Sequence, residues 1–343
     1  MSIPSFRQLI PATLAALAPF LAAPPASAQT VIKMATLVPQ GSSWHQALQE
    51  MAVEWQKISG GKVTLRLYPG GVAGDDSDVV RKMRLGTLNG ALLTSTGIQD
   101  VDRSVLALQI PLAFADYDEF DCTLKAVGPM IERALEARGF VMLGWTDGGY
   151  AHFFAKSPVR LPDDLKKQKL FVWAGDDMLV ELWKKAGFNP VPLPATEIST
   201  ALQTGLVTSL PAPPQAAVLF QWYNQAKHMT ALNYGILVGG FVVTKDTWDK
   251  IPAEFRPALL DSTRKTARRL ALLTRESAPK DIDAMVKRGL TVVSLDAAAL
   301  QQWHTVIEGV YPALRGKFIP AEAFDAAFKA RDACRASAKA TAR

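Results

Sequence analysis

Residues 31–69 carry the pattern that most limits the fold of this chain. Apolar and polar residues alternate in VIKMATL (31–37) and in KVTLRLYP (62–69), which is the period of a half-buried β-strand. Between them, apolar residues recur at steps of three and four, as on one face of a helix: Trp44, Leu48, Met51, Trp55 and Ile58. This order of strand, helix and strand predicts an α/β fold in which helices cover a sheet.

The chain has 343 residues, too many for one ordinary hydrophobic core, so we predict two lobes. The segment FVMLGWTDGGYAHFFAK (140–156) is expected to form two strands separated by a glycine-rich bend, where the chain crosses between the lobes. Residues 253–288 contain few helix-breaking residues, and they are expected to form one long helix across both lobes, bent at Pro279.

These patterns predict a division of the chain into seven parts. They are residues 1–28 as a signal peptide, 29–148 as the first part of lobe 1, 149–234 as lobe 2, 235–252 as a return to lobe 1, 253–288 as the long helix, 289–330 as a C-terminal packing region, and 331–343 as a frayed tail.

The first 28 residues have the layout of a cleaved secretory signal. Arg7 precedes an apolar run (9–23), and Ala26-Ser27-Ala28 supplies the small residues of a cleavage site. The run is short and broken by prolines, which argues against a membrane anchor. The sequence therefore predicts an exported protein that is cleaved after Ala28.

Export would permit a disulfide bond between Cys122 and Cys334, the only two cysteines. Nothing in their spacing places them within bonding distance, so a bond and two separate thiols both remain open. The net charge of +6 is spread along the chain and not gathered into a basic arm, which argues against a nucleic-acid partner.

The residues offer little sign of catalytic chemistry. The sequence lacks the motifs of a serine hydrolase nucleophile, a zinc protease and a phosphate-binding loop, and its four histidines lack the spacing of metal ligands. No metal, no cofactor and no enzyme activity are therefore predicted. Three acidic pairs precede expected helices, where capping of the helix is the favoured interpretation over catalysis: Asp75-Asp76, Asp163-Asp164 and Asp176-Asp177.

Aromatic residues gather at the ends of expected strands and beside glycine turns. They are Trp44, Trp145, Tyr150, Phe153, Phe171, Trp173, Trp222 and Tyr234. In open α/β sheets ligands bind at the carboxyl ends of strands, and small-molecule sites concentrate between lobes. We therefore expect several of these rings to face a cleft.

Six segments in one order resemble the extracytoplasmic solute-binding subunit of TRAP transporters, the tripartite ATP-independent periplasmic importers. They are ATLVPQGSSWHQAL, LRLYPGGVAGDD, VVRKMRLGTLNGALLTSTG, KSPVRLPDDLKKQKLFVWAG, AGFNPVPLPATEISTALQTGLV and VVTKDTWDKIPAEFRPALL. The resemblance, which runs from about Val31 to Phe318, implies a two-lobed periplasmic clamshell with hinge strands and a long bracing helix. It also implies a ligand that is passed, without chemistry, to a small and a large membrane subunit.

The sequence departs from this family where a carboxylate is usually held. In the strand where the family has an arginine, Lys169-Leu170-Phe171-Val172 places a phenylalanine. A second frequent arginine corresponds to Ala151, and the family's Gln-Glu-Asn-Pro corresponds to Leu210-Pro211-Ala212-Pro213. We therefore expect an apolar pocket for a more hydrophobic organic ligand, lined by Phe171, Trp173, Ala212 and Pro213. The sequence of this strand also resembles a branch of the family whose members work with a periplasmic helical-repeat partner.

The resemblance assigns further residues to the cleft. They are Trp44 and His45 in a first loop, Asp75 in a second, Thr94 and Ser95 at a strand end, Trp145 and Tyr150 on the crossing segment, and Tyr234 at the return to lobe 1. A plain turn remains the alternative for Thr94 and Ser95, and packing in the core remains the alternative for Tyr234, Phe171 and Trp173.

Two other functions remain open at this point. The same clamshell could serve as a carrier or sensor that passes an apolar ligand to another periplasmic protein or receptor. An α/β enzyme would instead need an acid such as Asp147 or Asp176 acting in the cleft.

Overall fold

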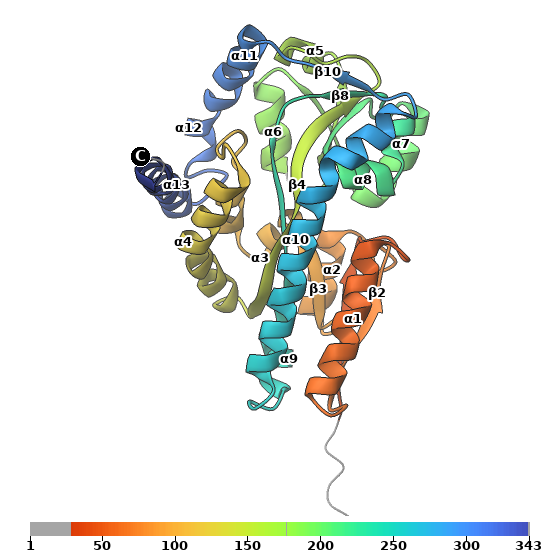
Figure 1. The fold of residues 1–343 in the computed structure, drawn as a ribbon, viewed down its shortest axis with the longest axis vertical. Helices are drawn as coiled ribbons and strands as arrows, with labels where there is room; N and C mark the ends of the chain where they lie inside the picture. The colour runs from red at the N-terminus through yellow and green to blue at the C-terminus, as the bar shows by residue number, and fades with distance from the viewer. Residues whose placement is uncertain (1–28, 176, 342–343) are drawn as a thin grey trace, which may run out of the picture.

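A computed structural model describes residues 29–175 and 177–341. The predicted signal peptide, residues 1–28, and Asp176 lie outside the described residues. Figure 1 shows two lobes, one above the other, with the strand β4 (Phe140–Ala155) and the helix α10 (Arg256–Val286) running through both. No helix among the described residues is long and apolar enough to cross a membrane.

The first lobe opens with the predicted strand, helix and strand. β1 (Thr30–Thr36) pairs in parallel with β2 (Val63–Tyr68) and with β3 (Gly90–Thr94), and α1 (Ser43–Ile58) connects the first two. Helix α1 buries the predicted apolar stripe and begins after Ser42, whose hydroxyl accepts a hydrogen bond from the backbone N–H of His45. The β-α-β prediction is confirmed.

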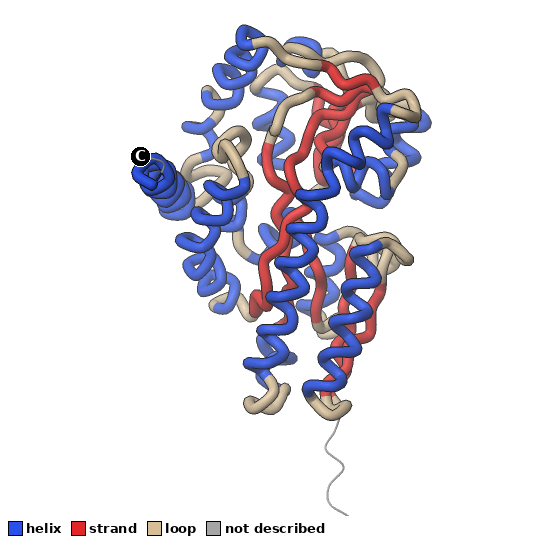
Figure 2. The backbone as a smooth tube through the Cα atoms, viewed as in Figure 1, coloured by secondary structure: helices blue, strands red, loops and turns tan. Residues whose placement is uncertain are grey.

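Two strands cross between the lobes: β4 (Phe140–Ala155) and β9 (Gly235–Thr244). They are antiparallel neighbours in a sheet of order β2-β1-β3-β9-β4-β7-β5-β6, which Figure 2 shows in red through the middle of the molecule. The prediction of two strands at 140–156 is wrong, because β4 is continuous. Its glycines are accommodated by register shifts between Met142 and Gly144 and between Asp147 and Tyr150.

The second lobe is built on β5 (Lys169–Trp173), which lies parallel to β6 (Asn189–Leu193) and β7 (Ser209–Ala212). The last part of β4 pairs with β7 and β8 (His228–Thr230), and β8 pairs with β10 (Thr291–Val293). Since β4 pairs with β9 at one end and with β7 at the other, it joins the sheets of the two lobes.

The remaining helices connect these strands or follow them in the chain. They are α2 (Asp76–Arg84), α3 (Ser95–Val101), η1 (Arg103–Leu108), α4 (Tyr117–Glu136), α5 (Pro162–Lys166), α6 (Asp177–Lys185), η2 (Ala195–Glu197), α7 (Ile198–Thr204), α8 (Pro214–Leu219), η3 (Trp222–Asn224), α9 (Lys245–Lys250), α10 (Arg256–Val286), α11 (Ala297–Glu308), α12 (Tyr311–Leu314) and α13 (Ala321–Thr341).

The long helix is confirmed as α10, which continues through Pro279. It contacts α1 in the first lobe, β4 along the crossing, and α8 in the second lobe, as Figure 1 shows. Its buried face carries small and apolar residues such as Leu259, Thr266 and Leu270. Helix α10 therefore braces both lobes.

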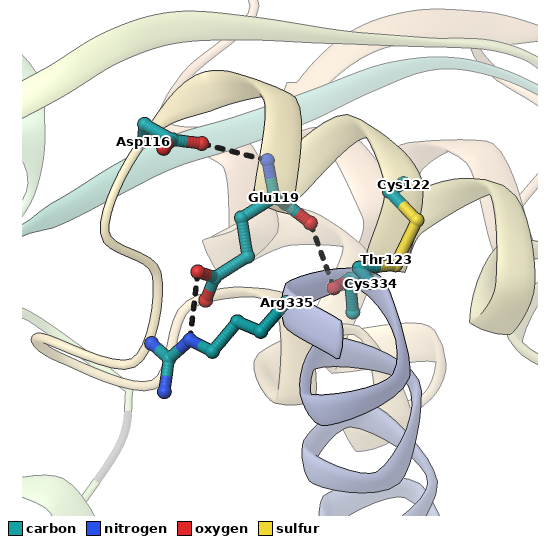
Figure 3. Close-up of a disulfide and its surroundings, with 6 residues drawn as sticks. All are labelled: Asp116, Glu119, Cys122, Thr123, Cys334 and Arg335. Atoms are coloured by element: carbon teal, nitrogen blue, oxygen red, sulfur yellow. Dashed lines mark hydrogen bonds and ion pairs between the residues drawn. A yellow bond between two sulfur atoms is a disulfide. The ribbon is translucent and has the colours of Figure 1, made fainter. Parts of the chain in front are cut away.

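The C-terminal helix α13 packs against α4 of the first lobe. A disulfide bond joins Cys122 of α4 to Cys334 of α13, with 6.1 Å between their Cα atoms (Figure 3). The next residue of α13, Arg335, donates a hydrogen bond of 2.8 Å to the buried carboxylate of Glu119, which lies one turn before Cys122 on α4. The prediction of a frayed tail is therefore wrong for residues 331–341, which these contacts hold as helix.

Replacing both cysteines with serine is expected to lower the free energy of unfolding by about 2–4 kcal/mol, because the bond closes a long loop in the unfolded chain. The two cysteines are separated by 212 residues. Urea unfolding of the Cys122→Ser/Cys334→Ser protein, compared with the oxidised wild type, measures the loss. Equal unfolding midpoints, with the wild-type bond verified by mass spectrometry, would contradict this expectation.

Candidate ligand-binding site

A cavity of about 490 Å³ lies between the two lobes. Its walls come from β3, α3 and η1 of the first lobe, from β5, α6, α7 and α8 of the second lobe, and from both crossing strands. A volume of this size is typical of a site for a small organic molecule. The cleft that the sequence predicts is therefore present.

Eight of the twelve residues assigned to the site line this cavity: Trp44, Thr94, Ser95, Phe171, Trp173, Ala212, Pro213 and Tyr234. Phe171 belongs both to the core and to the cleft, because its side chain is buried in the core of lobe 2 and also forms part of the cavity wall. Its ring packs edge-on against Trp173 at 5.1 Å between centroids.

The other four assigned residues do not line the cavity. Two of them, His45 and Asp75, hold loops of the first lobe. Nδ1 of His45 accepts a hydrogen bond from the backbone N–H of Gly41, which closes the loop before α1. Asp75 caps α2, as the capping interpretation expects, and accepts a hydrogen bond from the backbone N–H of Asp76 at 2.9 Å.

Trp145 and Tyr150 lie on β4 but pack against the helical side of lobe 1. The indole N–H of Trp145 donates to Glu132 of α4 at 2.8 Å. The ring of Tyr150 lies 4.7 Å from that of Tyr117. For Tyr150, the register shift between Asp147 and Tyr150 explains the difference, because it changes which of the following residues face the cleft, and Ala151 lines the cavity instead.

The cavity wall is mainly aliphatic and aromatic, and its polar members are hydroxyl, amide and backbone groups. Asp147 is the one charged residue among the described residues of the wall, and neither lysine nor arginine is among them. The carboxylate of Asp147 is 3 % exposed and forms an ion pair of 2.7 Å with Arg275 of α10. Burial raises the pKa of Asp147, and the bonds from Arg275 oppose this shift.

This pairing argues against Asp147 as a catalytic acid or base. Both of its oxygens accept hydrogen bonds from Arg275, and one also accepts from the backbone N–H of Gly149 at 3.0 Å. A carboxylate that is held in a buried ion pair by three hydrogen bonds is poorly suited to exchange a proton with a ligand. Among the described residues, no group of histidine, cysteine, aspartate and glutamate side chains could hold a metal ion.

Hydroxyl and amide groups gather on the wall where β3 passes into α3. Thr94 caps α3, Ser95 shares a short hydrogen bond with Gln109, and Gln109 donates to the backbone oxygen of Ile236 on β9 at 3.0 Å. Beneath this turn lies the buried carboxylate of Asp76, which accepts hydrogen bonds from the hydroxyl and the backbone N–H of Thr94 at 2.6 and 2.9 Å. Asp76 therefore positions the polar part of the wall.

Burial raises the pKa of Asp76 to about 7, and the hydrogen bonds from Thr94 only partly oppose this shift. Between the unfolded value of 3.8 and about 7, the folded protein holds a proton that the unfolded chain has released. The contribution of Asp76 to stability therefore falls as the pH rises through this window, by up to about 1.4 kcal/mol per pH unit.

We expect Asp76→Asn to remove this pH-dependent contribution to the free energy of unfolding. The variant should therefore gain stability relative to wild type between pH 5 and pH 7, and the difference in stability between the two proteins should stay constant above about pH 8. Urea unfolding at several pH values measures it. The buried His152, whose pKa is lowered to about 4, acts in the opposite direction but cancels in the comparison because both proteins contain it. Parallel stability profiles of the two proteins would contradict the assignment.

Two hydrogen-bonded links join the lobes around the cavity. In the first, the indole N–H of Trp44 donates to the hydroxyl of Thr274 on α10 at 3.0 Å, and this hydroxyl donates to Gln215 of α8 at 2.9 Å. In the second, the backbone N–H of Ala195 in lobe 2 donates to Asp75 in lobe 1 at 2.8 Å. The cavity is thus enclosed by a closed arrangement of the lobes.

The C-terminal region, for which the sequence predicts only a packing role, also contributes to the cavity wall. Helices α11 and α12 and the following loop supply one end of the wall, through Trp303, Val306, Ile307, Val310, Leu314, Phe318 and Ile319. A helical stripe of apolar residues has the same sequence pattern whether it faces a core or a cavity. The pattern alone therefore carried no signal for this part of the site.

Two lobes on a mixed sheet, two crossing strands, a bracing helix and an interlobe cavity define a solute-binding protein of the periplasmic-binding-protein fold. The sequence model for bacterial extracellular solute-binding protein, family 7 (DctP), matches residues 34–317. This chain therefore belongs to that family.

Curated relatives and solved structures agree with this assignment. The C4-dicarboxylate-binding periplasmic protein DctP of Rhodobacter capsulatus is 26% identical over 310 residues, which cover 88% of this chain and 91% of that protein. The 2,3-diketo-L-gulonate-binding periplasmic protein YiaO of Escherichia coli is 24% identical over 257 residues, which cover 74% of this chain and 78% of that protein.

Among solved structures, the sugar acid binding protein DctPAm of Advenella mimigardefordensis, in complex with galactonate, has a TM-score of 0.83 at 17% identity, covering 90% of this chain and 99% of that one. A TRAP periplasmic solute binding protein of Ralstonia eutropha with bound (S)-2-acetolactate has a TM-score of 0.81 at 23% identity, covering 89% and 99%. These two structures show that the fold is shared.

Proposed function

We propose that this protein is the periplasmic component of a TRAP-type secondary importer, which captures a small organic ligand between its lobes and delivers it to the small and large membrane subunits. Membership of the family supports this role, as do related structures described as TRAP periplasmic solute binding proteins. The protein binds and releases its ligand and performs no reaction on it. A periplasmic helical-repeat protein is a further proposed partner, on the resemblance of the Phe171–Trp173 strand alone.

The ligand is relatively hydrophobic, and the composition of the cavity wall is the observation that carries this proposal. Relatives bind carboxylates, including succinate in two solved structures. Burying a carboxylate without a cationic partner costs several kcal/mol, and the described wall offers neither lysine nor arginine. The one charged residue of the wall, Asp147, is an anion that is already paired with Arg275, so it offers a ligand carboxylate no counter-ion.

The positions at which the resemblance places arginines do lie at the cavity. Phe171 and Ala151 both line it, as do Pro211, Ala212 and Pro213 of β7 and the following turn. On the resemblance, Phe171 and Ala151 replace cationic residues with apolar ones, and Pro211 and Ala212 replace polar ones, while all four positions line the cavity. We infer that the chain belongs to a branch of the family without the usual carboxylate-binding arginine.

Thermal unfolding in the presence of three compounds tests the ligand class. 3-Phenylpropanamide is aromatic and uncharged, 3-phenylpropanoate has the same shape with a carboxylate, and succinate is a dicarboxylate. A ligand that binds only the folded state raises the midpoint temperature of unfolding. We expect the amide to raise it most and the monocarboxylate to raise it less, and we expect no shift from succinate. A larger shift from succinate than from the amide would reject the hydrophobic assignment.

A genetic experiment distinguishes import from the alternative function as a carrier or sensor. Deleting the gene for the large membrane subunit is expected to abolish uptake of the natural ligand. Uptake or signalling that persists without this subunit would favour delivery to another periplasmic protein or receptor.

A further inference from the structure

The cavity has an apolar end, formed by α6 and by the C-terminal helices α11 and α12 with the residues beside them. All the wall residues that these segments contribute are aliphatic or aromatic, and they include Leu182, Trp183, Trp303, Val306, Val310 and Leu314. The rings of Trp183 and Trp303 belong to one apolar cluster with Tyr234, which also lines the cavity.

Polar groups of the C-terminal helices bond to the protein itself. The indole N–H of Trp303 donates to the backbone oxygen of Arg160 at 2.9 Å, which attaches α11 to lobe 2. The hydroxyl of Tyr311 donates to the backbone oxygen of Pro111 at 2.6 Å, which attaches α12 to lobe 1. A ligand at this end of the cavity therefore meets hydrocarbon and ring surfaces.

The rest of the wall carries uncharged polar groups from both lobes. They are the hydroxyl and amide groups of Thr94, Ser95 and Gln109 in lobe 1 and of Ser199 and Gln215 in lobe 2. The polar and apolar parts adjoin, because Ile110 and Pro111 directly follow Gln109 and also line the cavity. Ile110 packs in the same core cluster as Leu314 of α12. The wall thus changes from polar to apolar along one short loop.

An unfilled apolar space is unusual inside a protein, since interiors are packed with few voids larger than a water molecule. Water is a poor occupant of such a space, because it finds no polar partners there. The apolar end is continuous with the cavity between the lobes. Its natural occupant is therefore an apolar part of the same ligand.

We propose that the ligand is an amphipathic molecule, with an uncharged polar head at the hydroxyl and amide groups and an apolar tail between α6, α11 and α12. This arrangement rests on the proposed function, since it assigns the two ends of the hydrophobic ligand proposed above. It gives the C-terminal helices a role in specificity, because they limit the length of the tail.

Isothermal titration with butanamide, hexanamide and octanamide tests the tail, since these uncharged amides differ only in chain length. For wild type we expect the dissociation constant to fall by roughly fourfold for each methylene group that enters the apolar end. Octanamide should therefore bind at least about tenfold more tightly than butanamide.

Val306→Trp and Val310→Phe place a larger side chain in the apolar end and leave the polar groups unchanged. We expect either variant to bind butanamide as wild type does and to lose most of the preference for octanamide. Leu300→Trp is the matched control on α11, because Leu300 is 41% exposed and is not among the described wall residues. It should keep the full preference. Binding of butanamide shows that a variant is folded around an intact polar end.

Equal binding of butanamide and octanamide by wild type would reject the tail and leave the ligand class standing. A preference for octanamide that persists in Val306→Trp and Val310→Phe would also reject the place of the tail. If none of the three amides binds, the uncharged, hydrophobic ligand class falls together with its tail. The failure of this inference is therefore distinguishable from the failure of the proposed function.

Discussion

Replacing Arg275 with methionine is expected to lower the free energy of unfolding by about 3–5 kcal/mol, because it leaves a buried carboxylate without its counter-ion. The guanidinium of Arg275 is 10% exposed and bonds to Asp147 of β4 and to Asp121 of α4, with shortest distances of 2.7 and 2.6 Å. It also lies 4.3 Å from the ring of Tyr117. Burial alone would lower the pKa of Arg275, but the two acids raise it, so the side chain stays charged.

Arg269→Met provides the control for this experiment on the same helix. Arg269 pairs with Glu50 of α1 at 2.6 Å, but both side chains are well exposed, so its loss is expected to cost less than about 1 kcal/mol. Adding Asp147→Asn to Arg275→Met should recover most of the stability, since it removes the unpaired buried charge. Equal losses for the Arg275 and Arg269 variants in urea unfolding would show that the buried triad does not brace α10.

Phe171→Arg is expected to abolish binding of an apolar ligand and to introduce binding of succinate. The side chain of Phe171 is 1% exposed and forms part of the cavity wall beside Trp173. An arginine there would place a guanidinium at the site, where a carboxylate can pair with it through two hydrogen bonds. The buried charge also costs stability, about 2–4 kcal/mol without a ligand.

Isothermal titration with succinate and with 3-phenylpropanamide measures the change in specificity. Phe171→Leu is the matched control, because it alters the packing without adding a charge. It should weaken binding of the amide and leave succinate unbound. If succinate bound the wild type as tightly as Phe171→Arg, the absence of a cation at this position would not determine the ligand class.

The elements that the sequence predicts best are those whose periodicity extends over many residues. Helix α1 and its flanking strands follow directly from the stripe through Leu48 and Met51 and from the alternation in β1 and β2. The pattern is sufficient there because burial of one helix face and of one strand face determines the fold locally. The long helix α10 follows for the same reason.

The features that the sequence does not predict depend on contacts between distant segments. The bond between Cys122 and Cys334 depends on how α13 docks on α4, which no spacing encodes. The resemblance predicts Tyr150 in the cleft, but the irregular register of β4 places Ala151 there. Likewise, the carboxylate of Asp75 reaches across to Ala195, 120 residues away, so this contact appears only in the folded protein.

We propose that the cavity takes a relatively hydrophobic ligand, and native mass spectrometry of the protein purified from the periplasm of its own host tests this proposal most directly. Mass spectrometry under gentle conditions retains the bound molecule, and denaturation then releases it for identification. The cavity chemistry predicts an apolar or aromatic compound without a second carboxylate. A tightly held C4-dicarboxylate would contradict the claim.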